Sequence, residues 1–318
     1  MRNDREVRTP LASRLRRMIV GGARDPHDPD MAHKMALVAF FAWVGLGADG
    51  LSSSCYGPPE VFLVLLKYPF LSLFVALGSA LTVIIISMSY GQVIDLFPNG
   101  GGGYLVASRL LSPRLGMISG CALIIDYTLT IALSIASGAD AVFSFLPHDL
   151  LPWKTWVAVF GVVALTALNM RGVKESVAPL VPVFMVFVLS HLFAIGYVLF
   201  THLGEMGQMA ANTMTDVQTA SSQMGVMGMV LLMLRAYGMG AGTYTGIEAV
   251  SNGLPMLREP RARTGKRTMI YMASSLVVAV VGLMCCYVLC EVKFEDGKTL
   301  NAVMLESMTA GWRFPWVG

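Results

Sequence analysis

Residues 45–59 read GLGADGLSSSCYGPP and interrupt an apolar segment that extends from residue 35 to residue 66. A second interruption, GMGAGTYTG at residues 238–246, lies in another apolar segment. Glycine and proline at this density unwind a helix and free backbone N–H and C=O groups that hydrocarbon cannot hydrogen-bond. Such backbone persists in a membrane only where it is buried in protein or lines a cavity. The two breaks therefore predict a ligand site inside a membrane protein.

The composition points to the same class of protein. Of the 318 residues, 55% are hydrophobic and only 14% are charged, whereas soluble domains carry about 25% charged residues. The formal net charge of +3 is too small to indicate a nucleic-acid partner, and the five cysteines lack the paired spacing of a disulfide framework. These features argue against a soluble enzyme and predict an all-α polytopic protein that needs the lipid bilayer and no cofactor.

Seven segments are candidate membrane spans, since a spanning helix needs about 20 mostly apolar residues. They are residues 35–66, 70–94, 115–146, 157–170, 177–200, 224–250 and 269–289. Most of the 23 lysines and arginines precede the first span or lie in loops on the same side, so the positive-inside rule places the N-terminus in the cytoplasm. We expect a multi-pass protein of the cell (inner) membrane, with a cytoplasmic segment at residues 1–34, a transmembrane domain at residues 35–290 and an extracytoplasmic segment at residues 291–318.

The two breaks lie in the first and sixth spans, which run in opposite directions because they are five spans apart, an odd number. Broken helices at corresponding positions of two inverted halves are typical of secondary transporters that bind substrate near the bilayer midplane. A five-plus-five repeat requires three more helices after the seventh span. We therefore expect a transporter fold truncated after about seven helices, and no transport by these residues alone.

The acidic residues Asp49, Asp126 and Glu248 lie within predicted spans. An ionised side chain at the bilayer centre costs about 2.5–3.5 kcal/mol on insertion scales, so each carboxylate needs a partner, a cavity or a proton. Asp126, Thr130 and Ser134 recur every four residues and share one helix face. Carboxylates, hydroxyls and freed carbonyls, together with the negative end of the first half-helix, suit a desolvated monovalent cation.

Four ordered stretches resemble one family of transporters. They are ADGLSSSCYGPPE at 48–60, FPNGGGGY at 97–104, LIIDYTLT at 123–130 and TGIEAVSN at 245–252. These stretches resemble the amino acid–polyamine–organocation (APC) superfamily, and within it the potassium–proton symporters of the KimA and KUP type. The resemblance extends from about residue 35 to residue 300.

The resemblance implies a LeuT-like fold, a homodimer when the protein is complete, and potassium uptake together with protons. It also implies roles for individual residues. Glu248 would take part in proton coupling, and the potassium ion would be coordinated by Asp49, Tyr56, Asp126, Thr130, Ser134 and a threonine of the sixth span, either Thr245 or Thr243.

Two other functions remain open at this point. Many members of the superfamily carry amino acids or polyamines, and an aspartate at the first break would hold an amine, so a proton-coupled amino acid or polyamine permease is the main alternative. The stretch GLGAD at 45–49, followed later by Asp126 and Tyr127, also resembles the motifs of intramembrane aspartyl proteases. Because the order of those motifs is reversed here and the spacing differs by one residue, an enzyme is only a minor alternative.

Overall fold

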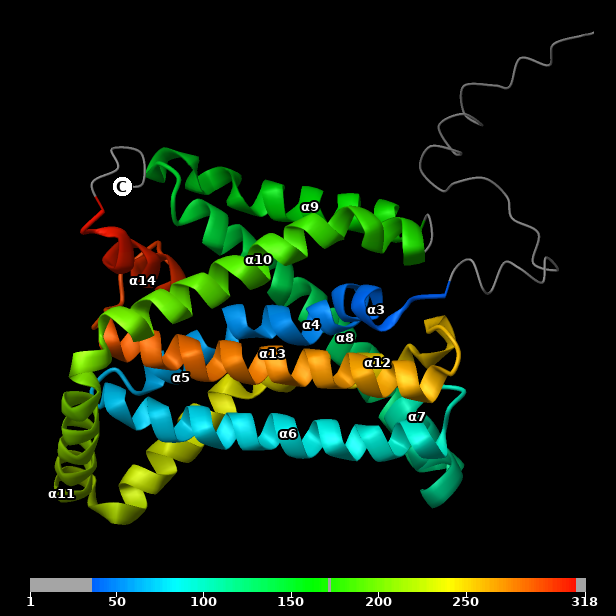
Figure 1. Ribbon diagram of the computed structural model, residues 1–318, viewed down its shortest axis with the longest axis horizontal. Helices are drawn as coiled ribbons and strands as arrows, with labels where there is room; N and C mark the ends of the chain where they lie inside the picture. Colours follow the sequence, from blue (N-terminus) through cyan, green and yellow to red (C-terminus); the bar gives the residue numbers. More distant parts are fainter. Residues whose placement is uncertain (1–35, 171–172, 313–318) are drawn as a thin grey trace, which may run out of the picture.

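The computed structural model describes residues 36–170 and 173–312 (Figure 1). The expected cytoplasmic segment at residues 1–34 lies outside the described residues. The described chain is almost entirely helical, and its only β-type pairing is an isolated bridge between Leu37 and Leu257. An all-α architecture follows, as the composition predicts.

The first predicted span consists of several short helices. The regular helix is distorted at Leu46 (φ −108°, ψ −36°) and is lost at Tyr56 (φ −123°, ψ −29°), which leaves helical geometry. The pieces are α3 (Ala39–Gly45), α4 (Gly47–Ser52), a 3₁₀ turn (Ser53–Cys55) and α5 (Gly57–Val64). The glycine- and proline-rich stretch that predicts a break is the stretch where the helix breaks.

Six helical segments among the described residues are long and apolar enough to cross a membrane, so the chain is a multi-pass membrane protein. The broken first span is too short in each piece to be one of them. The main helices are α6 (Ser72–Leu96), α8 (Pro113–Phe143), α9 (Lys154–Asn169), α10 (Val173–Thr201), α11 (Met206–Met239) and α13 (Arg261–Leu289). Shorter elements are α7 (Gly102–Val106), α12 (Ala249–Asn252) and α14 (Leu300–Thr309).

An additional helical segment precedes the predicted start of the sixth span. Helix α11 begins at Met206, but the backbone of Gly225 is non-helical (φ 75°, ψ 162°) and divides it in two. The part after Gly225 corresponds to the predicted span, whereas residues 206–224 form a separate helical arm (Figure 1). The polar composition of this arm hides it from a search for apolar segments. The second break follows α11 as a 3₁₀ turn (Gly240–Tyr244) that leads to α12.

Helices α6 and α13 run side by side through the middle of the molecule (Figure 1) and pack against the pieces of the first span. At the end that carries α7, the core contains Leu37, Ile94, Ile247 and Met272. An ion pair between Asp95 and Lys266 ties α6 to α13 at the same end. Both broken spans are therefore held on one packed pair of helices.

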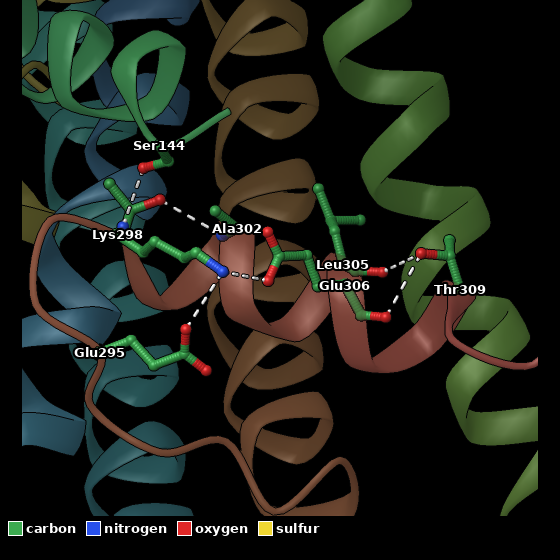
Figure 2. Close-up of polar contacts among 8 residues, drawn as sticks. Ser144, Glu295, Lys298, Ala302, Leu305, Glu306 and Thr309 are labelled. Carbon is green, nitrogen blue, oxygen red and sulfur yellow. Dashed lines mark hydrogen bonds and ion pairs between the residues drawn. The ribbon is translucent and has the colours of Figure 1, made fainter. Parts of the chain in front are cut away.

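Helix α14 lies at the opposite end of the molecule and is fixed by polar contacts. Figure 2 shows the Lys298 ammonium between two carboxylates, 2.6 Å from Glu306 and 3.1 Å from Glu295. Thr299 caps the helix by accepting a hydrogen bond from the Ala302 N–H, and its own N–H donates to the Ser144 hydroxyl at 3.0 Å. The α14 segment is thereby joined to the end of α8.

Candidate functional site

The two breaks are in direct contact. The Ser53 hydroxyl, which is fully buried, donates a hydrogen bond to the Thr243 carbonyl at 2.9 Å. One turn away, the hydroxyls of Tyr56 and Thr245 share a hydrogen bond of 3.2 Å. Residues about 190 positions apart in the sequence thus form one polar centre.

Glycines allow this close approach of the two backbones. A Cβ atom at Gly57 would lie 2.0 Å from the Thr243 hydroxyl oxygen. A Cβ atom at Gly246, whose φ is +81°, would lie 2.7 Å from the Asp49 carboxyl carbon. Gly246 therefore places the second break directly against the Asp49 carboxylate, and a side chain at either glycine would push the breaks apart.

Helix α8 contributes the other predicted ligands. The carboxylates of Asp49 and Asp126 are near enough to influence each other electrostatically, and Ser134 lies near the Tyr56 hydroxyl. Thr130 lies between Asp126 and Ser134 on the same face of α8 and is buried. The structure thus brings one face of α8 to the junction of the two breaks.

Glu248 lies at the start of α12, beside the same centre. One of its carboxylate oxygens, Oε1, is buried without a hydrogen-bond partner. Its electrostatic neighbours are Asp126 and Asp49, and the Tyr127 hydroxyl lies nearby. A buried carboxylate oxygen without a partner is energetically costly when charged, which makes Glu248 a natural place for a proton.

The two threonines of the second break have different surroundings. The Thr243 side chain is 2% exposed and abuts Gly57, while its carbonyl accepts from Ser53. The Thr245 hydroxyl donates to the Gly242 carbonyl at 2.9 Å and meets the Tyr56 hydroxyl. Of the two threonines left open by the sequence, Thr245 is the one that faces the other site hydroxyls.

The glycines at the start of α7 contact α12 and the turn that follows it, a contact that sequence reasoning missed. A Cβ atom at Gly102 would lie 2.1 Å from the Asn252 side-chain oxygen, and one at Gly100 would lie 2.7 Å from Pro255. Asn252 in turn donates to the Tyr127 hydroxyl at 2.9 Å. Asn252 and Tyr127 both lie in stretches that resemble the family, but nothing in those stretches shows that the two residues touch.

Comparisons with known proteins place this geometry in a family context. The family model described as amino acid permease matches residues 37–309. The potassium transporter KimA of Bacillus subtilis (strain 168) is 31% identical over 276 residues, which is 85% of this chain and 44% of KimA. The low-affinity putrescine importer PlaP of Escherichia coli (strain K12) is 27% identical over 95 residues, 30% of this chain and 20% of PlaP. The chain spans less than half the length of either relative.

Proposed function

We propose that this chain, which belongs to the amino acid permease family and hence to its transporters, takes up potassium together with protons across the cell (inner) membrane. The observation that carries the proposal is the meeting of Asp49, Tyr56 and Thr245 where the two breaks touch. Helix α8 presents Asp126 to the same point. An oxygen-lined centre with two carboxylates suits a monovalent cation that has left its water.

The proposed coordination uses both broken spans and α8. Asp49 and Asp126 repel each other when both are ionised, and a bound cation offsets that repulsion. Hydroxyl oxygens complete the shell and replace the water of hydration. In this proposal the potassium ligands are Asp49, Tyr56, Asp126, Thr130, Ser134 and Thr245, with Thr243 holding the backbone of the second break in place.

Glu248 is the proposed coupling residue. Its unpartnered Oε1 would be neutralised by a proton, and its electrostatic neighbours are the two aspartates that would hold the cation. Proton binding at Glu248 and cation binding at the aspartates would then each change the charge that the other group experiences. Such linkage between two sites is what couples one transported species to the other.

The wider architecture is part of the same proposal. Breaks in the first and sixth spans support a LeuT-like five-plus-five inverted repeat. The charge distribution supports a cytoplasmic N-terminal segment at residues 1–34, a transmembrane domain at residues 35–290 and an extracytoplasmic segment at residues 291–318. We propose a homodimer for the complete protein.

Polyamine import is the second candidate. The similarity to the putrescine importer PlaP supports it, and so does the gathering of three carboxylates, Asp49, Asp126 and Glu248, around one centre. Two ammonium groups of a diamine would find acidic partners there.

The two candidates are separated by a competition experiment. The complete gene product that contains this sequence is expressed in cells that lack their own potassium uptake, and rubidium influx is followed with an excess of either potassium or putrescine. Potassium transport predicts rubidium influx that potassium suppresses and putrescine does not. Absence of rubidium influx from well-expressed protein, with putrescine uptake in its place, would overturn the potassium assignment.

A further inference from the structure

The second break is fixed on two opposite sides. On one side it meets the first span, through the Thr243 carbonyl, the Thr245 hydroxyl and the backbone of Gly246. On the other side the intervening Tyr244 reaches α6, where its hydroxyl donates to the Ser79 hydroxyl at 2.9 Å. Tyr244 and Thr245, adjacent in sequence, therefore bind different spans.

A second tyrosine reaches the same face of α6. The hydroxyls of Tyr237 and Thr82 are 2.7 Å apart. Because the Thr82 hydroxyl donates to the Gly78 carbonyl at 2.9 Å, Tyr237 is the donor to Thr82. Ser79 and Thr82 stand three residues apart and so share one face of α6, and the rings of Tyr237 and Tyr244 lie 5.7 Å apart. The two tyrosines thus dock the start of the break on α6.

The glycine-rich sequence of the second break makes its geometry depend on these contacts with α6. Gly238, Gly240 and Gly242 contribute no side chains and little conformational preference. Unwound backbone also lacks the regular i to i−4 hydrogen bonds that fix a helix. The geometry of residues 240–246 therefore depends on side-chain contacts, and Ser79, only 4% exposed, offers Tyr244 a partner shielded from water.

We propose that Tyr244 and Ser79 are positioning residues of the cation site, which hold the second break so that the Thr245 hydroxyl faces Tyr56. This inference rests on the proposed transport function. Neither residue touches the cation. Their effect passes through the backbone of the break, and it makes α6 part of the support of the site.

The test uses rubidium uptake by the complete gene product with Tyr244→Phe, Ser79→Ala and the double variant. Hydrogen bonds between membrane helices are modest, so each single variant should raise KM for rubidium by about threefold to tenfold. Vmax should stay within about twofold, as expected when a binding interaction is lost. The double variant should be no worse than either single variant, because both remove the same hydrogen bond.

Two further variants serve as rescue and control. Ser79→Thr keeps a hydroxyl for Tyr244 and should restore KM to within about twofold of the wild type. Tyr271→Phe makes the same chemical change on the exposed side of α13, where the side chain is 43% exposed, and should leave KM unchanged. A wild-type KM in Tyr244→Phe, or single effects that multiply in the double variant, would overturn the positioning role.

Failure of the proposed function gives a different result. If the wild type takes up putrescine and no rubidium, potassium transport is wrong and the same KM comparison is made with putrescine. If the wild type carries neither, the proposed function fails. The Tyr244–Ser79 contact is then judged by the melting temperatures of the purified wild type, the two single variants and the double variant. Additive losses in that cycle would show that Tyr244 and Ser79 do not act as a pair.

Discussion

Two pairs of membrane helices in this molecule differ in how much of each helix is buried. In the most apolar stretches of α13 and α6, 61% and 44% of the residues are buried, against 6% in α8 and none in α9. Hydropathy identifies all four as spans, because lipid solvates an apolar face as well as another helix does. The packed pair, α6 and α13, supports both breaks, and the exposed pair, α8 and α9, presents Asp126 to them.

Hydrogen bonds join α8 to other segments of the described chain at two places. Near α7, Asn252 donates to Tyr127 of α8. Near α14, the Thr299 N–H donates to Ser144 at the end of α8.

The largest expected contrast comes from one substitution in the second break, which the packed pair supports, and one in α8. Gly246→Ala adds about 1–2 kcal/mol of left-handed backbone strain and forces a Cβ atom against Asp49, so we expect loss of transport and a lower melting temperature. Gly138→Ala in α8 meets nothing within 4 Å and gains helix propensity, so stability should stay equal or rise by up to about 1 kcal/mol. Equal effects on the melting temperature and uptake would contradict the contrast.

The exposed pair should matter for binding more than for folding. Asp126→Asn removes a charge from the cation site, and loss of a charged interaction of about 1.5–3 kcal/mol corresponds to an affinity weakened about 10- to 150-fold. Asp140→Asn is the matched control in the same helix, because Asp140 pairs with Lys154 at the surface. Rubidium titration should show the loss for Asp126→Asn only, with both variants folded, and normal uptake by Asp126→Asn would refute the assignment.

The contact between the two regions should have a smaller, measurable effect. Asn252→Ala removes the bond to Tyr127, and interhelical hydrogen bonds in membranes average about 0.6 kcal/mol. Asn169→Ala removes an exposed side chain whose amide donates to the Leu165 carbonyl of its own helix at 3.1 Å. The melting temperature should fall more for Asn252→Ala than for Asn169→Ala. The reverse order would mean that this contact does not hold α8 to the packed region.

The smallest effect concerns Lys298 beside α14. The hydrogen bond to Glu306, and to a smaller extent the one to Glu295, raises the pKa of Lys298 above the ordinary value of 10.5. A raised pKa in the folded state means that the contribution to stability is complete below pH 10.5 and is lost as the pH rises through the folded value. The difference in melting temperature between wild type and Lys298→Met should therefore exist at neutral pH and shrink under alkaline conditions. A melting-temperature difference that persists under alkaline conditions would mean that Lys298 stabilises the protein by packing and not by its charge.

Much of this arrangement follows from local sequence. The glycines and prolines at residues 45–59 and 238–246 predict both breaks, and the spacing of Asp126, Thr130 and Ser134 predicts their common face. These features depend on backbone preference and helix periodicity, which neighbouring residues determine.

Other features depend on contacts between distant residues and escape such reasoning. Tyr244 meets Ser79 across 165 positions, and Asn252 meets Tyr127 across 125. The arm at residues 206–224 is too polar for a hydropathy search, and α14 is too short. Neither spacing nor composition specifies which residues these elements touch.

We propose that potassium and protons are carried at the junction of the two breaks and α8, and this proposal can be tested. It is tested most directly by rubidium influx through the complete gene product, measured with and without a proton uncoupler in cells that lack their own potassium uptake. We expect the uncoupler to abolish influx through the wild type. In the Glu248→Gln variant, influx should no longer be coupled to the proton gradient. Influx of equal rate with and without the uncoupler, or none from well-expressed protein, would contradict it.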